Sequence, residues 1–401
     1  MSLLDHAIWW HVFPLGAVGA PIRDRSFGEV EHRLPRLEKW LDHAVALGCS
    51  GLLLGPVFES TSHGYDTLDH FLIDTRLGDD ADFDHLVAEA SRRGLAVMLD
   101  GVFNHVGIHH ELVTNGSGLI RRDASGAPAT WEGHGGLANF DHANPAVADY
   151  VVDAMTHWLR RGIAGWRLDA AYSVPSEFWA TVLSRVREQF PDAVFLGEIL
   201  HGDYAAMGQV GRMDTVTQYE LWKALWSSIK DTNFWELAHA LGRHDDFSSR
   251  LPMQTFVGNH DVTRIASAVG DDGAALATIA LFTLPGVPSV YYGDEQGFRG
   301  EKLEGWHADD QLRPALPDSP ADLSPMGAWM MRLHQDVIGL RRRNPWVTRG
   351  RVAVVDKQNE WITWEVTGEG HTMRVELALQ PTHSARVLVD GSPAYEWAPG
   401  R

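Results

Sequence analysis

The feature that most constrains the fold is a regular alternation of short apolar runs with longer segments of helical spacing, which continues to about residue 345. The apolar runs predict strands at 8–13, 51–58, 95–105, 163–169, 193–198, 214–219, 253–258 and 287–292. The helical segments are 33–48, 81–94, 145–162, 176–189, 221–241, 274–284 and 326–343. Strands that alternate with helices indicate a parallel sheet. About eight such units favour an α/β fold of the (β/α)8 type, a TIM barrel, with a doubly wound open sheet as the alternative.

The pattern changes after Pro345. The segments "RVAVVD", "EWITWEV", "HTMRVELAL" and "ARVLVDG" alternate polar and apolar residues, and no helical segment separates them. We therefore predict two domains, a catalytic barrel at 1–345 and a small all-β C-terminal domain at 346–401. Within the barrel, a short insertion rich in Gly, His and Asn follows the third strand at about 106–144.

The charge of the chain narrows the class of partner. Lys and Arg total 34 against 53 Asp and Glu, a formal net charge of -19, which argues against nucleic acid or an anionic membrane as partner. It does not argue against an uncharged small molecule such as a sugar. The first residues show no signal-peptide pattern and no run looks long and apolar enough to cross a membrane, so we expect a cytoplasmic protein. The sequence does not indicate an oligomeric state.

Polar side chains gather where the predicted strands end. Arg167 and Asp169 end the fourth strand, Glu198 ends the fifth, and His260 and Asp261 follow the seventh. In a (β/α)8 barrel the active site lies at this end of the strands. Three carboxylates that converge from three strands are difficult to explain as ordinary strand termini, so we expect them to form the active site.

This set of residues suits the cleavage of a glycosidic bond, which uses one ionised carboxylate and one protonated carboxyl group. Arg167 and Asp169 are two apart, so on a strand they face the same way, and the guanidinium is expected to keep Asp169 ionised. Glu198 has no basic neighbour within its strand and is expected to hold the proton. We predict that the two carboxyl groups lie about 5–5.5 Å apart, the spacing of retaining enzymes.

Four segments resemble the signature regions of the α-amylase superfamily of glycoside hydrolases (glycoside hydrolase family 13). They occur in the order of that family and on the expected strands: "DGVFNH" (100–105), "GWRLDAA" (165–171), "FLGEIL" (195–200) and "FVGNHD" (256–261). Two further segments, "HGYDTLD" (63–69) and "YYGDEQG" (291–297), are also similar to family segments. The resemblance covers residues from about 5 to 345.

The resemblance implies a role for each matching position. It makes Asp169 the nucleophile, Glu198 the general acid/base and Asp261 the third carboxylate, which stabilises the transition state. It assigns substrate binding to five further residues: Tyr65, His105, Arg167, His260 and Arg313. The aspartate that pairs with Arg313 is either Asp309 or Asp310, because the spacing fits both.

Some positions depart from the family pattern. The insertion after the third strand is short, and Tyr172 and Ser173 stand where many family amylases have Lys-His, a pair that contributes to acceptor binding and to calcium. His109 and His110 are expected to be solvated loop residues rather than metal ligands. We therefore expect no cofactor: calcium binding is possible but is not expected to be required.

The predicted function is a retaining α-glycoside hydrolase that cleaves α-glucosidic bonds, expected to be α-1,4, in short glucans or maltooligosaccharides through a covalent glycosyl-Asp intermediate. One alternative is a transglycosylase or an isomerase-type α-glucosyl transfer with the same residues. A second is a non-catalytic carbohydrate-binding homologue, which would be expected to have lost one of the three carboxylates. A metal-dependent amidohydrolase would need a His-x-His pair after the first strand, where the chain has only His11.

Overall fold

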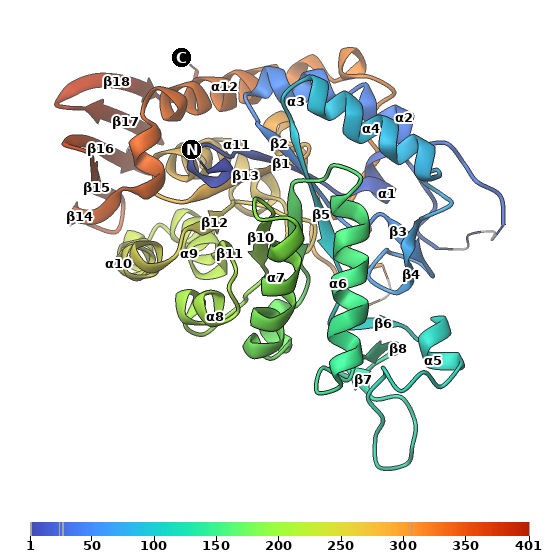
Figure 1. Cartoon of the computed structure of the whole chain (residues 1–401). Helices are drawn as coiled ribbons and strands as arrows, with labels where there is room; N and C mark the ends of the chain where they lie inside the picture. The colour runs from blue at the N-terminus through green and yellow to red at the C-terminus, as the bar shows by residue number, and fades with distance from the viewer. Residues whose placement is uncertain (1, 24, 26–27, 306, 401) are drawn as a thin grey trace.

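The computed structural model describes residues 2–23, 25, 28–305 and 307–400, and it confirms the predicted barrel. Eight parallel strands close into one sheet in chain order, and the last pairs with the first (Figure 1), so the doubly wound alternative is wrong. The barrel strands are β1 (Trp9–Val12), β2 (Gly51–Leu54), β5 (Ala96–Gly101), β9 (Gly165–Leu168), β10 (Val194–Gly197), β11 (Thr215–Thr217), β12 (Met253–Thr255) and β13 (Val287–Tyr291).

Alternate residues of these strands belong to two apolar clusters. Trp10 and Leu52 pack in the large cluster that joins the barrel to its helices. Trp9, Leu53 and Met98 form a separate cluster, as side chains of opposite parity on a strand must. The barrel interior is therefore filled with side chains, and ligands are left to the loops at its end.

Helices cover the outside of the barrel. They include α1 (Pro14–Ala17), α2 (Leu34–Glu38), α3 (Leu41–Leu47), α4 (Asp80–Arg92), α6 (Pro145–Leu159), α7 (Ser176–Gln189), α8 (Tyr204–Val210) and α12 (Ala328–Arg343). The single helix predicted at 33–48 is thus two short helices. The helix predicted at 221–241 is also two, α9 (Tyr219–Lys230) and α10 (Phe234–Arg250), because Thr232 adopts a left-handed conformation between them.

Helix α11 (Ile265–Thr283) begins nine residues before the predicted start at 274 and is kinked at Gly270, whose φ is +75°. By length and composition it could cross a membrane, which the sequence pattern did not lead us to expect. Two thirds (67%) of its apolar window is buried inside the protein, and it packs against α9 and α12. This burial is typical of a core helix.

The segment predicted as a loop at 106–144 has structure of its own. It contains β6 (His105–Gly107), the short helix α5 (Glu111–Thr114), β7 (Thr130–Trp131) and β8 (His134–Asn139), with the three strands in one small sheet. It projects from the barrel at the carboxyl ends of the strands (Figure 1). A second addition, the hairpin of β3 (Phe58–Ser60) and β4 (Thr67–Ile73), follows β2.

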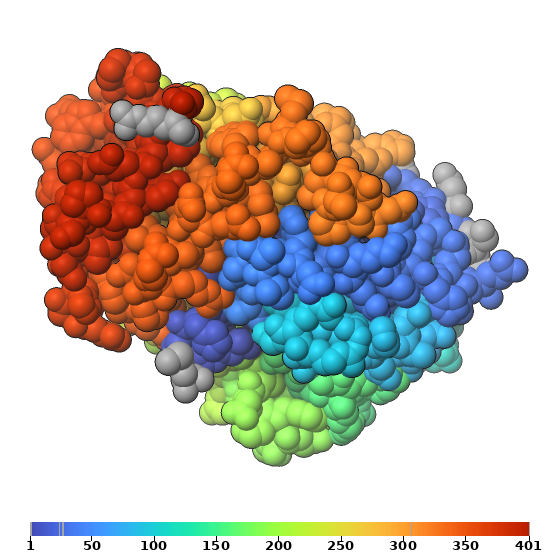
Figure 2. Space-filling view, turned by 90° about the horizontal axis from the view of Figure 1, so that it is seen from above, coloured from blue at the N-terminus to red at the C-terminus, as the bar shows by residue number. Residues whose placement is uncertain are grey.

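The C-terminal part is an antiparallel sheet, as predicted, but it has five strands where the pattern indicated four. They are β14 (Arg351–Lys357), β15 (Trp361–Gly368), β16 (His371–Ala378), β17 (Ser384–Val389) and β18 (Ser392–Trp397). The sheet contacts α10, α11 and α12, and from above it forms one body with the α12 side of the barrel (Figure 2). The domain boundary near residue 345 stays a prediction.

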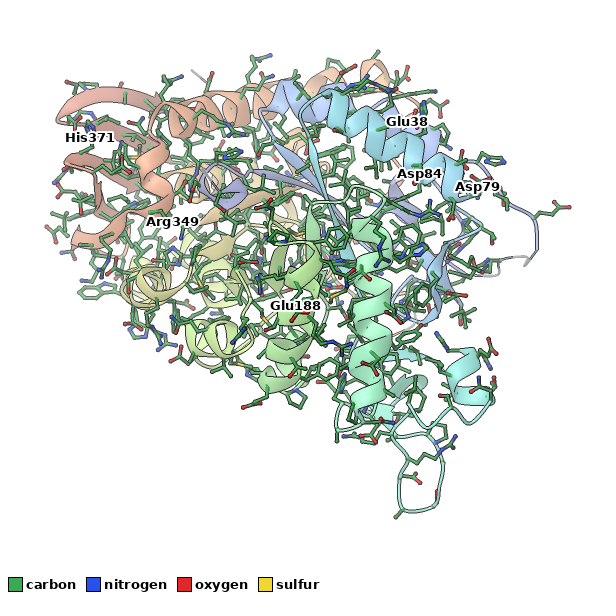
Figure 3. The ribbon with its side chains drawn as sticks, viewed as in Figure 1. Glu38, Asp79, Asp84, Glu188, Arg349 and His371 are labelled. Carbon is green, nitrogen blue, oxygen red and sulfur yellow. The ribbon has the colours of Figure 1, made fainter. Side chains whose placement is uncertain are left out.

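Charged side chains occupy the outer faces of the helices (Figure 3). Asp84 on α4 and Glu188 on α7 are exposed there. Arg349, beside the last helix, pairs with Asp5 at 3.0 Å. The acidic excess of the chain is therefore compatible with an apolar core, since the exposed acids lie in water.

Candidate active site

A cleft of about 450 Å³ lies at the carboxyl ends of the barrel strands. It brings together the predicted residues Tyr65, His105, Asp169, Glu198, Asp261 and Arg313. The barrel register explains the central pair: Leu168 on β9 pairs with Gly197 on β10, so the next residues, Asp169 and Glu198, leave neighbouring strands at the same level. The structure therefore assembles the three carboxylates that the sequence singled out.

Arg167 is the centre of the charged network. The buried guanidinium lies 2.9 Å from Asp169 Oδ1 and 2.6 Å from Glu198 Oε1, and it donates to both oxygens of Asp100 at 2.8 Å. Asp100 reaches it because Asp100 on β5 pairs in register with Arg167 on β9. Arg167 thus forms ion pairs with three carboxylates rather than with Asp169 alone.

Glu198 has more partners than its own strand suggests. Its own strand carries no basic residue, as noted from the sequence, but Arg167 approaches it from the adjacent strand. Its Oε2 also accepts from the backbone N–H of Ala170 at 2.9 Å, and its Oε1 accepts from the hydroxyl of Tyr219 at 3.2 Å. Ala170 has a φ of +45°, a strained value for alanine. This left-handed backbone conformation directs its N–H toward Glu198.

The pKa of the Asp169 carboxyl is raised well above its usual value, which corrects the expectation that Arg167 keeps it ionised. Burial is the largest cause; Arg167 opposes it, while Glu198 and Asp100 raise the pKa further. One guanidinium thus faces three buried carboxyl groups and does not outweigh the effect of burial and of the neighbouring acids on Asp169.

Asp261 has the opposite electrostatics. Its carboxylate lies 3.0 Å from Nε2 of His260 and 3.0 Å from the guanidinium of Arg313, and 36% of its side chain is exposed. Burial opposes its charge, but His260, Arg313 and Arg167 together hold its pKa well below the usual range. Asp261 is therefore the carboxylate that stays ionised.

The structure also decides the partner of Arg313. Its guanidinium lies 2.9 Å from Asp309 Oδ2, whereas Asp310 pairs with Arg23 at 2.6 Å. The Arg313 side chain also donates to the backbone oxygen of His260 at 3.1 Å. Asp309 is thus the partner, and the pair fixes one wall of the cleft.

Aromatic rings also line the cleft. The ring of Tyr65 stacks on His260 with centroids 5.3 Å apart, and its hydroxyl donates to Asp100 at 3.0 Å. His105 stacks on Trp131 at 4.7 Å. Burial lowers the pKa of His105 to about 4, so this imidazole is neutral at pH 7. The two ring pairs present flat, largely apolar surfaces beside the carboxylates.

Sequence reasoning missed two residues that line the cleft: Tyr219, which follows the sixth strand at the start of α9, and Trp131, which lies in the added sheet. Tyr172, noted from the sequence as a departure from the family pattern, also lines the cleft. Tyr219 could have been found from its place directly after a barrel strand. Trp131 gave no signal, because the segment that carries it was expected to be a loop.

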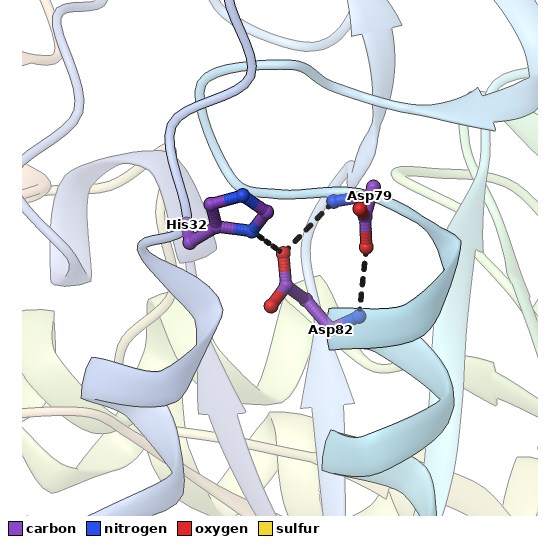
Figure 4. A group of neighbouring side chains, drawn as sticks. All are labelled: His32, Asp79 and Asp82. Atoms are coloured by element: carbon purple, nitrogen blue, oxygen red, sulfur yellow. Dashed lines mark hydrogen bonds and ion pairs between the residues drawn. The ribbon is translucent and has the colours of Figure 1, made fainter.

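One group of side chains within the described ranges has the spacing of metal ligands: His32, Asp79 and Asp82. It lies at the N-terminus of α4, outside the cleft, and one oxygen of each of its two carboxylates already accepts hydrogen bonds (Figure 4). Asp79 accepts from the backbone N–H groups of Ala81 and Asp82, and Asp82 accepts from the backbone N–H of Asp79 and contacts His32 at 2.5 Å. These bonds describe a helix cap.

The chain is similar in sequence to proteins of one known family. The family described as "Alpha amylase, catalytic domain" matches residues 37–118 and 132–380. The chain is 29% identical to the intracellular maltogenic amylase of Bacillus subtilis (strain 168), over 89% of this chain and 63% of that protein. It is 30% identical to a cyclomaltodextrinase of Geobacillus thermopakistaniensis, over 80% of this chain and 57% of that protein. The chain thus spans less than two thirds of the length of these relatives.

A solved structure is similar over the whole chain. The cyclic α-maltosyl-(1→6)-maltose hydrolase of Arthrobacter globiformis, in complex with maltose, aligns with a TM-score of 0.82 at 25% identity. The alignment covers 99% of this chain and 100% of that one. The barrel together with the C-terminal sheet is therefore an arrangement that also occurs as a whole protein chain elsewhere.

Proposed function

Because this chain belongs to the α-amylase family of glycoside hydrolases, we propose that it is a retaining α-glycosidase that hydrolyses α-glucosidic bonds in short glucans. The observation that carries the proposal is the contact of one buried guanidinium, that of Arg167, with both Asp169 and Glu198. The contact holds the two carboxyl groups side by side on neighbouring strands, and glycoside cleavage needs such a pair, one as nucleophile and one as acid.

In the first step Glu198 acts as the acid and Asp169 as the ionised nucleophile. The Asp169 carboxylate attacks the anomeric carbon, while Glu198 gives its proton to the glycosidic oxygen, which leaves with the bonding electrons. In the second step the Glu198 carboxylate takes a proton from water, the water oxygen attacks the same carbon, and the ester to Asp169 breaks. Two displacements return the α-configuration.

The remaining residues act on the sugar and on the developing positive charge. Asp261 is held ionised by His260 and Arg313, so its charge can stabilise an oxocarbenium-like transition state and accept from ring hydroxyls. Tyr65, stacked on His260, and His105, stacked on Trp131, offer apolar surface and donors to the bound sugar. None of these steps uses a cofactor, and we propose that calcium is not required.

The names of similar proteins narrow the substrate. The relatives are a maltogenic amylase and cyclomaltodextrinases, and the similar solved structure is that of a cyclic maltosyl-maltose hydrolase. We extend this to the present chain as an activity on maltooligosaccharides, linear or cyclic, with α-1,4 bonds cleaved. The first relative is named intracellular, which supports a cytoplasmic location for this chain as well.

A substrate panel tests the proposal. The purified protein is incubated with maltose, maltotriose, cyclodextrin, isomaltose, sucrose, trehalose and soluble starch, and the products are identified by chromatography. Release of glucose or maltose from maltooligosaccharides or cyclodextrin supports it. Products longer than the donor would favour glucosyl transfer, and no turnover with correct binding would favour a carbohydrate-binding homologue.

A further inference from the structure

His11 is a buried histidine of the first barrel strand, with 5% of its surface exposed. On β1 it has the same parity as Trp9, which belongs to the cluster that fills the barrel, whereas Trp10 packs toward the helices. His11 therefore points into the barrel. It lies two residues nearer than Trp9 to the carboxyl end of the strand, which is the end that carries the catalytic cleft.

The side chain of His11 contacts His260, one of the predicted substrate-binding residues. Its Nε2 lies 3.3 Å from Nδ1 of His260, and the two rings meet edge to face, with centroids 5.2 Å apart at 81°. Tyr291, which pairs in register with His11 on β13, packs against the His11 ring at 5.2 Å. The barrel itself therefore holds His11 in place, and the contact joins a barrel strand to the loop after β12.

Stacking fixes the plane of the His260 ring. The ring centroid lies 5.3 Å from that of Tyr65 at an angle of 12°, and 6.0 Å from that of Phe13 at 19°. A half-turn of an imidazole about the bond that carries it keeps this plane but exchanges each nitrogen with a carbon. Stacking therefore allows both orientations, and only hydrogen bonds at the two nitrogens distinguish them.

The contacts in the cleft require a proton on Nε2 of His260. Asp100 accepts from Arg167 with both oxygens at 2.8 Å, and the Tyr65 hydroxyl donates its single proton to Asp100 at 3.0 Å. The Tyr65 oxygen can therefore contact Nε2 of His260 only as an acceptor. Asp261 Oδ2, at 3.0 Å from the same nitrogen, is an acceptor as well, because this carboxylate stays ionised.

We propose that His11 is a positioning residue for the reaction: by its contact with Nδ1 it holds the imidazole of His260 so that the Nε2–H points at Asp261 and Tyr65. Since His260 is 1% exposed, loss of His11 would leave Nδ1 buried without this partner and would weaken the preference for one orientation. The inference rests on the proposed function for the reaction that is served.

The chemistry of His11 suits this role. Burial lowers its pKa well below that of an ordinary histidine, and His260 and Arg167 lower it further, so the ring stays neutral. A nitrogen of a neutral imidazole either donates or accepts, depending on the tautomer. His11 can therefore pair with Nδ1 of His260 whether or not that atom carries a proton.

The kinetic test replaces His11 in two ways. His11→Leu removes both ring nitrogens, whereas His11→Gln keeps a donor and an acceptor at a similar reach. With maltotriose as substrate, kcat of His11→Leu should fall about tenfold and KM should change less than about twofold, because Asp261 acts on the transition state. His11→Gln should stay within about threefold of the unchanged protein, since a hydrogen bond is restored.

His244→Leu is the matched control. It removes a histidine that is also buried, on α10, where Nε2 meets the backbone oxygen of Pro285 at 3.0 Å, and it should leave kcat unchanged. A folded His11→Leu with unchanged kcat would overturn the proposal. So would His11→Gln as slow as His11→Leu, because the loss would then follow from packing and not from the hydrogen bond.

A measurement without substrate tests the same contact. In protein with isotope-labelled histidine, heteronuclear NMR distinguishes protonated from unprotonated ring nitrogens, and the signals of His260 are those that disappear in His260→Gln. At about pH 8, where ordinary histidines are neutral, Nε2 of His260 should carry a proton in the unchanged protein and in His11→Gln. In His11→Leu the Nδ1 signal should move, and part of the population should carry the proton on Nδ1 instead.

The spectra decide the role of His11 even without kinetics. An unprotonated Nε2 of His260 in the unchanged protein would contradict the proposal, whether or not any variant folds. A His260 spectrum that is the same in folded His11→Leu as in the unchanged protein would contradict it too. Lack of products from the unchanged protein would instead disprove the proposed hydrolysis, and the two failures are thereby distinguished.

Discussion

The guanidinium of Arg167 lies 2.6 Å from Glu198 and 2.9 Å from Asp169, so a single cation contacts both carboxyl groups that the proposed reaction needs. It also holds Asp100, which in turn accepts from Tyr65. The charge state of the cleft is therefore set by the network rather than by one ion pair.

Removal of the Arg167 cation should strongly reduce both the activity and the stability of the protein. Arg167→Met leaves Asp100 buried without its cationic partner and removes the cation that contacts both Asp169 and Glu198. We expect kcat to fall by more than about 100-fold and the free energy of unfolding to fall by about 3–5 kcal/mol. Steady-state kinetics and denaturant titration measure both. Arg386→Met, which removes an exposed arginine of β17 paired with the exposed Glu396 at 3.4 Å, is the control and should change neither appreciably.

The pH profile should reflect the raised pKa of Asp169. The ionised form attacks, and a raised pKa keeps the carboxyl protonated up to a higher pH. Activity is therefore lost as pH falls through a value well above the ordinary aspartate pKa of about 4. His105 has a pKa of about 4, and burial lowers the pKa of His11 well below normal. Both imidazoles therefore stay neutral in the pH range where activity is lost, and their titration does not cause that loss.

The measurement is kcat/KM against pH on an aryl α-glucoside. A loss of activity that begins only at or below pH 4 would contradict the raised pKa of Asp169. With an activated leaving group that needs no protonation, Glu198→Gln should keep an acid limb, because Asp169 remains.

Tyr219 should matter through one hydrogen bond. Tyr219→Phe removes the hydroxyl that donates to Glu198 at 3.2 Å and accepts from Asn259 at 2.8 Å, without changing the ring. We expect kcat to fall about tenfold, the effect of about 1.4 kcal/mol on the barrier. Tyr395→Phe in the C-terminal sheet is the matched change far from the cleft. An unchanged kcat in Tyr219→Phe would mean that the contact plays no part in the reaction.

The absence of a calcium requirement stays a prediction. The added sheet after β5 carries few acidic residues, and the described metal-like group at α4 is a helix cap. Calcium needs six to eight oxygen ligands. After dialysis against EDTA, activity and Tm should match those of the untreated protein. A large loss of both that calcium alone restores would disprove this.

The sequence predicted the barrel and the positions of the three carboxylates, because polar residues at strand ends and the period of the apolar pattern depend on local order. It could not predict that Arg167 also serves Glu198, since that contact depends on the register between β9 and β10. The sequence also could not predict the break between α9 and α10. Thr232 turns the chain there in a left-handed backbone conformation, which threonine rarely adopts. Trp131 reached the cleft through a small sheet whose strands are too short to give a periodic signal.

The most direct measurement of the central claim is the configuration of the first product. Proton NMR follows the anomeric signals while the enzyme cleaves a maltooligosaccharide, before mutarotation mixes the forms. Attack by Asp169 followed by attack of water predicts that the α-anomer appears first, with the carboxyl groups of Asp169 and Glu198 about 5–5.5 Å apart. A β-anomer as the first product would show a single displacement by water and would contradict the covalent role of Asp169.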